Sequence, residues 1–378
     1  MFDDKDTAFM RQALTEARKG RGLTSPNPCV GAVIVKDNQI VGRGYHKKAG
    51  TPHAEIHALR QAGAAARGAT MYVTLEPCSH HGRTPPCSPA VAAAKIKKVI
   101  IGMLDPNPLV DGRGVSYLRE QGIAVTHGLL EKECRDLNRP FIQLITSGRP
   151  LVIMKAGLTL DGRITLRKGV GDRITGPRSE HFVHRLRNRC DGIMVGIGTI
   201  EIDNPSLTTR IAGRKGHDPL RIIVDTSLRI AEDARVLTQS SAAATWIFCS
   251  VSADFKKAAR LEDSGASVFR VATAQDGRLD LVAVLSTLGA RQITSLLVEG
   301  GAALHGSLLN AGLVDQVQLF FAPIFAGDNG ISVTSGHRMQ GDASQAVRLE
   351  NVSYRRCGDD MMVCGDVFYP ADSPDQTG

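Results

Sequence analysis

The stretch from His53 to Cys87 gathers residue types that bind a metal ion. His53 opens the run HAE, Cys78 closes the pair PC, and Cys87 follows nine residues later. Zinc prefers thiolate and imidazole ligands, and a catalytic zinc site uses three protein ligands and leaves the fourth position for water. His53, Cys78 and Cys87 supply that number of ligands. The spacing therefore predicts a zinc site in this stretch.

Glu55 adds acid–base chemistry to this predicted site. A carboxylate beside the metal, but not bound to it, can take a proton from water and deliver it to a leaving nitrogen. H-x-E followed by P-C-x-x-C is the signature of zinc nucleobase deaminases, although here the second cysteine comes nine residues after Cys78 rather than three. The spacing leaves two alternatives open: Cys78 with His81 as the ligand pair, or a structural site closed by His80 or His81 as fourth ligand. The joint pattern, with Pro77 and the position of Cys78 after a strand, favours a catalytic zinc site.

The elements around this stretch predict an α/β domain. Helical periodicity covers residues 6–19, 53–66, 88–95, 115–121 and 129–146, and a hairpin turns at Asp37-Asn38. Strand and helix in alternation imply a largely parallel sheet covered by helices. Cys78 directly follows the strand TMYVTLEP, and the carboxyl ends of strands are where such folds place their sites. The sequence therefore predicts that the metal ligands lie at the carboxyl-terminal edge of the sheet.

A second α/β series follows a Gly- and Pro-containing break at 147–150. Strands are expected in LVIMKAGLTLDG, GIMVGIGTI, LRIIVDT, TWIFCS, SVFRV, SLLVEGG and VDQVQLFFAPIFAG, helices over 178–189, 253–263, 279–288 and 302–310, and a last hairpin turning at 358–360. In VEGGAALHG a strand runs into glycines that open a helix, where backbone N–H groups can hold a phosphate. The chain of 378 residues thus divides into two predicted domains, over 1–147 and 148–371.

Composition narrows the classes of partner. No apolar run is long enough for a membrane span, and no secretory signal opens the chain, so a cytoplasmic protein without membrane contact is expected. The eight cysteines are expected to be mostly reduced core residues. The net charge is +8, but Lys and Arg are scattered and only 4% of residues are aromatic. This pattern favours an anionic small molecule over nucleic acid, and a homo-oligomer is expected because symmetric assemblies are common among enzymes.

Four segments carry a specific resemblance: TLEPCSHHGRTPPC, SPNPCVGAVIV, GYHKKAGTPHAEIHAL and DPNPLVDGRG. They resemble the deaminase half of the bifunctional riboflavin-biosynthesis deaminase–reductase family, which carries the longer cysteine spacing. The resemblance implies a cytidine-deaminase-like αβα domain in which Zn²⁺ is bound by one histidine and two cysteines and a glutamate moves the proton. The zinc ligands it implies are His53, Cys78 and Cys87, the proton carrier is Glu55, and the substrate contacts are Asn27, Asp105 and Asn107.

The second half resembles the reductase half of the same family in MKAGLTLDGRI, RITGP, VGIGTIEIDNPSLTTR, IIVDT and LVEGGAALHGSLLNAGLVDQ. The resemblance implies a dihydrofolate-reductase-like α/β domain that uses NADPH to reduce a ribosyl group to ribityl on a phosphorylated aminopyrimidine. The implied cofactor positions are Leu158, Arg173, Thr199, Asp203, Thr226, Gly300, Gly301 and Ala302. The implied substrate positions are Gly171, Arg187, Leu207, Arg210 and Glu299.

The chain departs from this family at two of those positions. Family members often have Ser or Thr where Gly171 stands and Trp where Arg173 stands, so altered contacts around the cofactor are expected. Arg187 and Arg210 suit a substrate phosphate, because a guanidinium can present paired N–H donors. Lys155 is a further candidate on the first strand of this half.

Two other functions compete with this interpretation. One is a zinc deaminase that acts on nucleic acid bases, with a second domain that is not a reductase. The other is a structural zinc protein in which both halves serve assembly. Scarce aromatic residues argue against the first, and the combined resemblance of both halves to one pathway argues against both.

Overall fold

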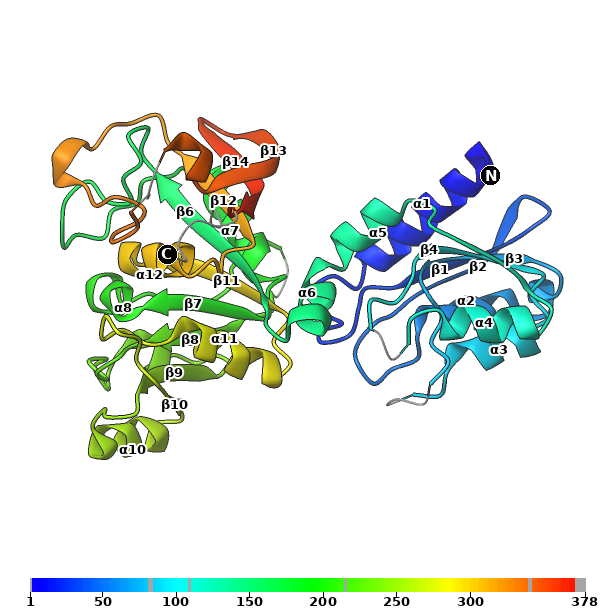
Figure 1. Ribbon diagram of the computed structural model, residues 1–378, viewed down its shortest axis with the longest axis horizontal. Coiled ribbons are helices and arrows are strands. Elements are labelled where there is room, and N and C mark those ends of the chain that lie inside the picture. The colour runs from blue at the N-terminus through cyan, green and yellow to red at the C-terminus, as the bar shows by residue number, and fades with distance from the viewer. Residues whose placement is uncertain (1, 81–83, 108–109, 214–215, 339–341, 371–378) are drawn as a thin grey trace, which may run out of the picture. The chain divides into compact units, whose positions relative to one another are not determined.

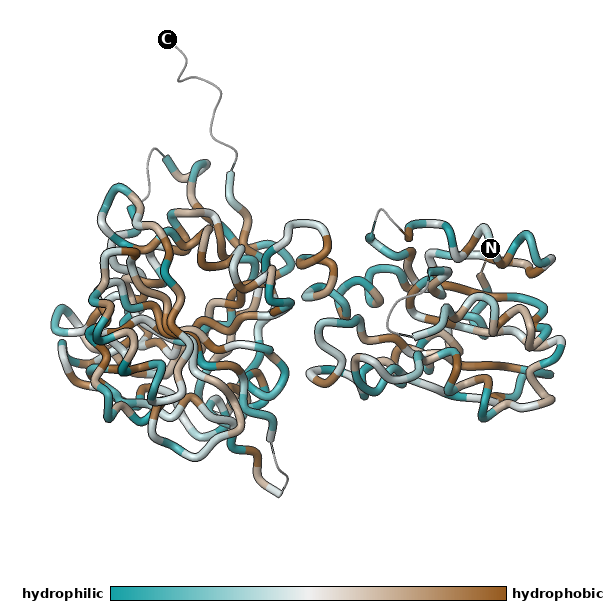
Figure 2. Tube along the Cα trace, turned by 90° about the horizontal axis from the view of Figure 1, so that it is seen from below, coloured by the Kyte–Doolittle hydropathy of each residue, from teal (hydrophilic) through white to brown (hydrophobic). Residues whose placement is uncertain are grey.

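The computed structural model describes residues 2–80, 84–107, 110–213, 216–338 and 342–370, and its chain forms two compact units. The first unit comprises Met1–Gly148 and the second Arg149–Gly378 (Figure 1). Each unit has its own hydrophobic clusters of buried side chains. Hydrophobic segments of the chain run through the interior of each unit (Figure 2). The two units are described separately below.

Within the described residues, the first unit is built on a five-stranded sheet with the order β2-β1-β3-β4-β5. The strands β3, β4 and β5 are parallel, whereas β1 runs antiparallel to both β2 and β3. The expectation of a largely parallel sheet is therefore correct only for β3, β4 and β5, because the hairpin β1–β2 forms an antiparallel edge of the same sheet. The strands are β1 Gly31–Lys36, β2 Gln39–Tyr45, β3 Thr70–Leu75, β4 Lys98–Met103 and β5 Ala124–His127; the helices are α1 Asp4–Arg18, α2 Ala54–Ala62, α3 Cys87–Ala93, α4 Arg113–Glu120, α5 Glu131–Leu137 and α6 Arg139–Ser147.

Two helices of the first unit pack directly onto strand backbone at glycines. A Cβ atom at Gly31 would collide with the carbonyl of Ala13 in α1, and one at Gly44 would collide with the carbonyl of Ala54 in α2. Only glycine permits such a close approach of helix and strand. The contact at Gly44 fixes the first turn of α2 against β2, and His53 is the residue that caps this turn.

The segment 129–146, expected as one helix, is broken at Asn138 into α5 and α6. Pro140 stands in the first turn of α6, where its missing N–H costs nothing, but within a continuous helix it would remove a hydrogen bond. The buried side chain of Asn138 also accepts a hydrogen bond from Cys29 N at 2.8 Å and donates one to Cys29 O at 3.1 Å. At this break, Asn138 therefore links the last helices of the unit to the loop between α1 and β1.

The second unit contains, among its described residues, a nine-stranded sheet with the order β10-β9-β8-β7-β11-β6-β12-β14-β13. The seven neighbouring strands β10, β9, β8, β7, β11, β6 and β12 are parallel to one another. The hairpin β13–β14 completes the sheet, with β14 antiparallel to β12. The strands are β6 Leu151–Leu158, β7 Gly192–Gly196, β8 Leu220–Val224, β9 Thr245–Ser250, β10 Ser267–Val271, β11 Ser295–Gly300, β12 Gln316–Phe321, β13 Arg348–Cys357 and β14 Asp360–Phe368; the helices are α7 Pro177–Arg187, α8 Ile197–Asp203, α9 Arg235–Thr238, α10 Phe255–Asp263, α11 Leu281–Ala290 and α12 Ala302–Asn310.

Several expected strands of this unit are shorter in the structure: the strand expected in LVIMKAGLTLDG, for example, ends at Leu158. GIMVGIGTI is a strand only to Gly196, after which α8 begins at Ile197, and the expected strand from Val314 ends at Phe321. A short apolar run does not by itself distinguish a buried strand from a buried helical turn. The correction matters because α8 carries Thr199 past the end of β7. The carboxyl ends of β6, β7, β8 and β11 meet at one edge of the sheet, where the pocket described below lies.

Candidate active sites

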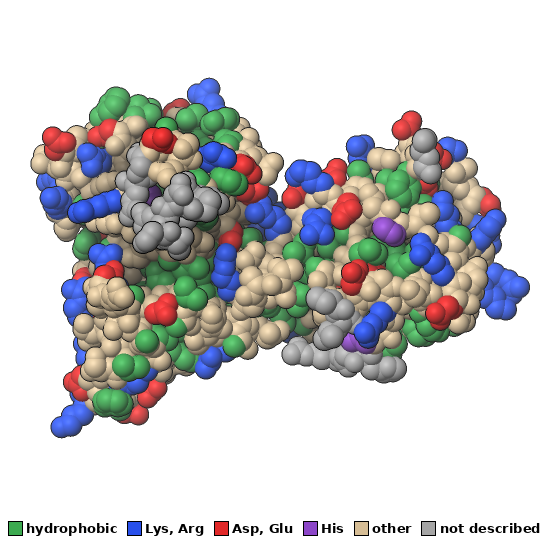
Figure 3. All heavy atoms as spheres, in the orientation of Figure 1, with side chains coloured by type: hydrophobic (Ala, Val, Ile, Leu, Met, Phe, Trp, Pro, Cys, Tyr) green, Lys and Arg blue, Asp and Glu red, His purple; other side chains and the backbone are tan. Residues whose placement is uncertain are grey.

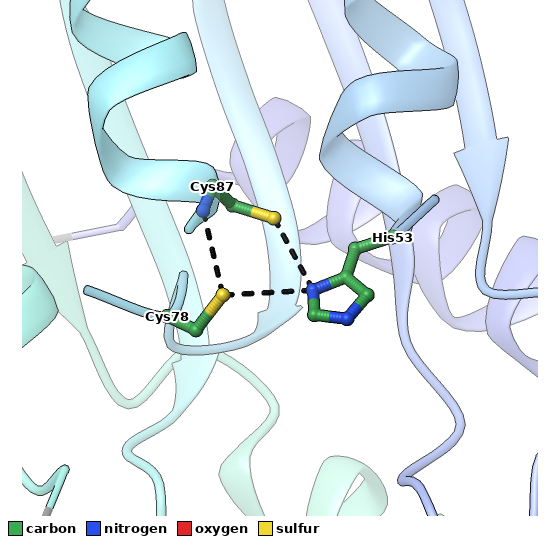
Figure 4. A group of neighbouring side chains, drawn as sticks. All are labelled: His53, Cys78 and Cys87. Carbon is green, nitrogen blue, oxygen red and sulfur yellow. Dashed lines mark hydrogen bonds between the residues drawn. The ribbon is translucent and has the colours of Figure 1, made fainter. Parts of the chain in front are cut away.

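His53, Cys78 and Cys87 converge at the edge of the first sheet (Figure 4). His53 Nδ1 lies 3.5 Å from Cys78 Sγ and 3.3 Å from Cys87 Sγ, and the three ligand atoms lie within 4.8 Å of one another. Ligands at the usual zinc distances in a tetrahedron would place nitrogen and sulfur about 3.5 Å apart. The donor set and its spacing therefore fit a zinc ion held by these three side chains.

Local structure brings the three side chains together. His53 is the residue preceding α2, Cys87 is the first residue of α3, and Cys78 follows β3. The loop between the cysteines closes through Cys78 O, which accepts hydrogen bonds from Cys87 N at 3.0 Å and Ser88 N at 3.1 Å. Thr84 Oγ1 lies 3.1 Å from His53 Nε2, so the second ring nitrogen also has a partner. Such a contact fixes the ring that presents Nδ1 to the sulfurs.

The two cysteines differ in their tendency to ionise. A hydrogen bond from the Cys87 thiol, against the effect of burial, lowers the pKa of Cys78 to about 4. The same contact and burial raise the pKa of Cys87. The hydrogen bond with Cys78 raises the pKa of His53. The pair thus holds one thiolate readily, and a thiolate is the form of cysteine that binds metal.

Glu55 lies in the first turn of α2 with its carboxylate buried. Among the described residues, its Oε2 atom has no hydrogen-bond partner. Burial, with the Cys78 charge nearby, raises the pKa of Glu55 to about 7. A carboxyl group with this pKa can accept and return a proton near neutral pH, and the unpartnered oxygen is the atom available for it.

Glu76 holds the segment that carries two of the predicted substrate contacts, and the sequence interpretation missed it. Its buried carboxylate accepts hydrogen bonds from Asp105 N at 3.2 Å, from Gly112 N at 3.1 Å and from Val115 N at 3.1 Å. Asn107 N in turn donates to Asp105 Oδ1 at 3.0 Å. Burial raises the pKa of Asp105. Glu76 therefore ties this segment to the strand end that supplies Cys78.

A second missed residue is His46, which is buried beside the metal ligands. Its Nε2 lies 3.1 Å from Nδ2 of Asn27 and its Nδ1 lies 3.4 Å from the carbonyl of Pro52, while its ring packs edge-on against His53. Burial and the His53 charge lower the pKa of His46. A neutral His46 accepts from Asn27 at Nε2 and thereby orients the amide. Of the alternative metal ligands, His80 is exposed, and His81 lies outside the described residues.

The second unit has a pocket of about 700 Å³ at the carboxyl ends of its parallel strands. Most of the predicted cofactor and substrate positions line it, but two do not: Leu158 and Leu207 are buried in the protein away from its surface. The predicted residues that line it are Gly171, Arg173, Arg187, Thr199, Asp203, Arg210, Thr226, Glu299, Gly300, Gly301 and Ala302.

A buried ion cluster forms part of the wall of this pocket. Arg187 donates from Nε to Glu299 Oε1 at 2.6 Å and from Nη2 to Glu299 Oε2 at 2.8 Å, and Lys155 Nζ lies 3.7 Å from Glu299 Oε2. Burial would raise the pKa of Glu299, but Arg187 and Lys155 hold it at about 2. Burial lowers the pKa of Lys155. The cluster presents an ionised carboxylate with an ammonium group beside it.

Two glycines bring other parts of the pocket wall close together. A Cβ at Gly171 would collide with Oδ1 of Asp203, so the carboxylate occupies the space that a Ser or Thr side chain would need there. A Cβ at Gly300 would lie 2.9 Å from Oγ1 of Thr199, so the end of β11 approaches α8 closely. Gly301 has φ of 92° and precedes α12. This turn presents backbone rather than side chains to a ligand, as a bound phosphate requires.

Positive and negative side chains are intermixed on the surface and do not form a patch of one sign on the face shown (Figure 3). On the face shown in Figure 3, Lys and Arg side chains are interspersed with Asp and Glu. None of the helices in the described parts of the chain combines the length and apolar character needed to cross a membrane.

Comparison with known proteins relates both units to characterised families. Residues 3–103 match the cytidine and deoxycytidylate deaminase zinc-binding region, and residues 150–363 match the RibD C-terminal domain. The fold class expected from the sequence, a cytidine-deaminase-like domain followed by a reductase domain, is confirmed by these matches. The expectation that zinc and NADPH are the cofactors agrees with them.

Similar proteins extend this relationship over nearly the whole chain. The riboflavin biosynthesis protein RibD of Bacillus amyloliquefaciens is 44% identical over 88% of this chain and 88% of its own, and that of Escherichia coli K12 is 41% identical over 90% and 94%. The solved structure of Acinetobacter baumannii RibD, form 1, superposes with a TM-score of 0.87 at 34% identity and covers 96% of this chain and 99% of its own. The chain therefore belongs to the RibD family of bifunctional deaminase–reductase enzymes of riboflavin biosynthesis.

Proposed function

We propose that the first unit removes an amino group from a phosphoribosylated diaminopyrimidinone and that the second unit then reduces the ribosyl group of the product to ribityl. A solved relative from Thermotoga maritima, 35% identical with a TM-score of 0.82, is described as a diaminohydroxyphosphoribosylaminopyrimidine deaminase and 5-amino-6-(5-phosphoribosylamino)uracil reductase. The observation that carries the proposal is the three-ligand cluster with the buried Glu55 beside it, in one chain with a pocket lined by ion pairs.

In the first reaction, His53, Cys78 and Cys87 would hold the zinc ion. When bound there, zinc lowers the pKa of a water molecule and so supplies a nucleophile near neutral pH. Glu55 accepts a proton at its unpartnered Oε2 and returns it to the departing ammonia, which its pKa of about 7 permits. We assign the orientation of the substrate ring to Asn27, held by His46.

The remaining substrate contacts of the first unit belong to the segment that Glu76 holds. Asp105 and Asn107 lie in this segment, and their backbone groups are fixed by hydrogen bonds rather than left free. A pre-positioned segment loses less conformational entropy when the substrate binds. We therefore assign substrate contact to these two residues.

In the second reaction, the protein's task is to position a hydride donor against an open-chain sugar carbonyl. The dinucleotide phosphates suit the backbone at Gly300, Gly301 and Ala302, with Thr199, Asp203 and Thr226 further along the same wall. Glu299 is an ionised acceptor for sugar hydroxyls, because Arg187 and Lys155 keep it charged. We assign the substrate phosphate to Arg210, which lines this pocket. We propose Leu158 as a further cofactor contact and Leu207 as a further substrate contact.

The product mass after incubation with the diaminopyrimidinone ribotide, zinc and NADPH tests both steps. Exchange of an amine for oxygen together with a gain of two hydrogens is expected. Glu55→Gln is expected to abolish ammonia release while the zinc content stays the same, because Glu55 is not a ligand. Normal ammonia release by this variant would refute the assignment. Arg210→Ala is expected to raise the substrate KM more than the NADPH KM.

We further propose that the deaminase domain covers residues 1–147 and the reductase domain 148–371, and that the enzyme is a cytoplasmic homo-oligomer. Size measurement by light scattering tests the assembly. Separate expression of each range, followed by its own activity assay, tests the boundary. Deamination of nucleic acid bases is not favoured, since the second unit matches a reductase family rather than a nucleic-acid-binding module.

A further inference from the structure

Helix α7 carries part of the pocket wall in the second unit, but its N-terminal residue cannot cap it. The N-cap position is Gly176, which has no side chain that could accept a hydrogen bond, and Pro177 follows it. The first turn of a helix leaves N–H groups unpaired and carries a partial positive charge. An acceptor for this end of α7 must therefore come from water or from another element. The residues of α7 that line the pocket are Glu180, Val183, His184 and Arg187.

The acceptor is Asp360, the first residue of β14, which directly follows the turn of the hairpin β13–β14. Its Oδ2 atom accepts a hydrogen bond from Gly176 N at 2.8 Å and another from Ser179 Oγ at 2.5 Å. Asp360 is only 4% exposed and Ser179 is fully buried. A carboxylate is stabilised at a helix N-terminus by the backbone dipoles. The hairpin thus supplies the cap that α7 itself lacks.

Apolar packing also holds α7 against the hairpin, but it does not fix the position of the helix along its axis. Contacts between apolar side chains are non-directional, whereas a hydrogen bond weakens steeply when its angle changes. The two hydrogen bonds to Asp360 therefore determine how far α7 can slide or turn on this apolar surface. The buried cluster that joins α7, β12 and the hairpin consists of Val183, Phe320, Cys357 and Met362.

The other end of α7 is held by a second buried carboxylate. Arg187, the last residue of the helix, binds both oxygens of Glu299 in β11 at 2.6 and 2.8 Å. A bidentate pair of this kind has a narrow range of geometries. The position of α7 must therefore satisfy Asp360 at its first turn and Glu299 at its last.

Resting on the proposed reductase function, we propose that Asp360 is a positioning residue for the deaminated ribotide. It fixes where α7 lies along its axis, and it thereby sets the Arg187–Glu299 pair and the part of the wall that meets the substrate. Asp360 is not among the described residues that line the pocket, so it acts through the helix and not on the ligand. The hairpin, which extends the sheet beyond β12, thus has a function in the site.

The first test is Asp360→Ala, which removes the acceptor. It is expected to raise the KM for the deaminated ribotide about tenfold, because a small displacement of one wall weakens several contacts at once. The KM for NADPH should change much less, since Thr199, Gly300 and Gly301 lie on other elements. The deaminase rate should stay the same, because the metal ligands belong to the other compact unit. Asp360→Asn, which keeps one acceptor oxygen, should raise the ribotide KM by a smaller factor.

A double variant separates the position of α7 from the stability of its first turn. Gly176→Asp places a carboxylate at the N-cap itself, where φ of −77° and ψ of 174° suit such a residue. A Cβ atom there would meet only the Asp360 oxygens, at 3.6 and 4.0 Å. Combined with Asp360→Ala, this change restores a cap without restoring the contact with the hairpin. The double variant is expected to regain most of the lost thermal stability and to keep the raised ribotide KM.

Asp191→Ala is the matched control. Asp191 Oδ2 accepts hydrogen bonds from Thr294 N at 2.7 Å and Ser295 N at 3.1 Å, so this carboxylate also joins distant parts of the second unit. It precedes β7, at the end of the strand opposite the pocket. Its replacement should lower the thermal stability and leave the ribotide KM unchanged.

The measurements are steady-state NADPH oxidation by the full chain and thermal unfolding of each variant. An unchanged ribotide KM in both Asp360 variants would overturn the proposal. Recovery of the KM together with the stability in the double variant would also overturn it, because Asp360 would then be only a cap. An equal rise of the KM in Asp191→Ala would show a general effect of lost stability and would count against it as well. Absence of ribotide-dependent NADPH oxidation in the unaltered enzyme would refute the proposed function instead.

Discussion

Replacing Arg187 by Gln leaves the buried Glu299 without its main counter-charge. Glu299 is almost fully buried, and its pKa is lowered from the ordinary 4.5 to about 2. A shift of this size corresponds to roughly 3 kcal/mol of stabilisation, since one pKa unit is about 1.4 kcal/mol. Removing one partner of a buried ion pair costs a similar amount, about 3–5 kcal/mol. We therefore expect Arg187→Gln to lower the free energy of unfolding of the second unit by about 3 kcal/mol at pH 7.

The destabilisation caused by Arg187→Gln should also depend on pH. In the unaltered chain, the folded-state pKa of Glu299 lies below the unfolded value, so this stabilisation is fully present above pH 4.5 and is lost as the pH falls towards 2. In the variant, burial dominates and raises the pKa of Glu299 above its ordinary value. The difference in stability between the two proteins should then be largest at pH 7 and should shrink towards pH 5, as Glu299 of the variant takes up a proton.

The chain offers a probe that reports on the second unit alone. Its one tryptophan, Trp246, lies in β9, and its ring packs 5.0 Å from that of Phe269. Urea unfolding followed by tryptophan fluorescence therefore reads this unit even where the two units unfold separately. Arg185→Gln controls for the loss of a charge on α7. The double variant with Glu299→Gln should be less destabilised than Arg187→Gln alone, because it leaves no uncompensated carboxylate. A loss below 1 kcal/mol, or one of equal size at pH 5 and pH 7, would refute the reasoning.

Three further predictions concern the first unit. Glu76→Gln replaces one acceptor oxygen by a donor opposite backbone N–H groups, so the deaminase KM should rise about tenfold with unchanged zinc content and reductase rate; unchanged KM in steady-state assays would contradict its positioning role. Cys87→Ser should lower the zinc measured by atomic absorption below one ion per chain, and full retention of zinc would rule Cys87 out as a ligand. Removal of zinc with a chelator should stop ammonia release while NADPH oxidation with the deaminated ribotide continues, and parallel loss of both activities would show that the second unit depends on the metal.

The sequence was sufficient for the parts of the sites that depend on short spacing. His53 and Glu55 lie in one turn of chain, and Cys78 follows a strand whose pattern is plain, so ligand types and secondary structure predicted the cluster together. The apolar strands likewise predicted two sheets. Boundaries were less accurate where a local pattern is ambiguous, as at Gly196, where a strand passes directly into a helix.

The contacts that the sequence did not reveal join residues far apart in the chain. Glu76 accepts from Val115, 39 residues away, and Arg187 pairs with Glu299, 112 residues away. Each of these side chains, taken alone, has the pattern of an ordinary charged residue. Their burial and partners are set by how strands and helices pack, and that packing is not encoded in any local spacing.

The pair of hydrogen bonds between Asn138 and Cys29 bears on the order in which parts of the first unit become fixed during synthesis. These residues are 109 positions apart, and their hydrogen bonds hold the loop that carries Asn27 against the last helices of the first unit. During synthesis the metal ligands leave the ribosome well before Asn138 does. A nascent chain can therefore bring its zinc ligands together while the loop that carries Asn27 still lacks this hydrogen-bonded anchor, and the loop gains the anchor only after Asn138 has been added.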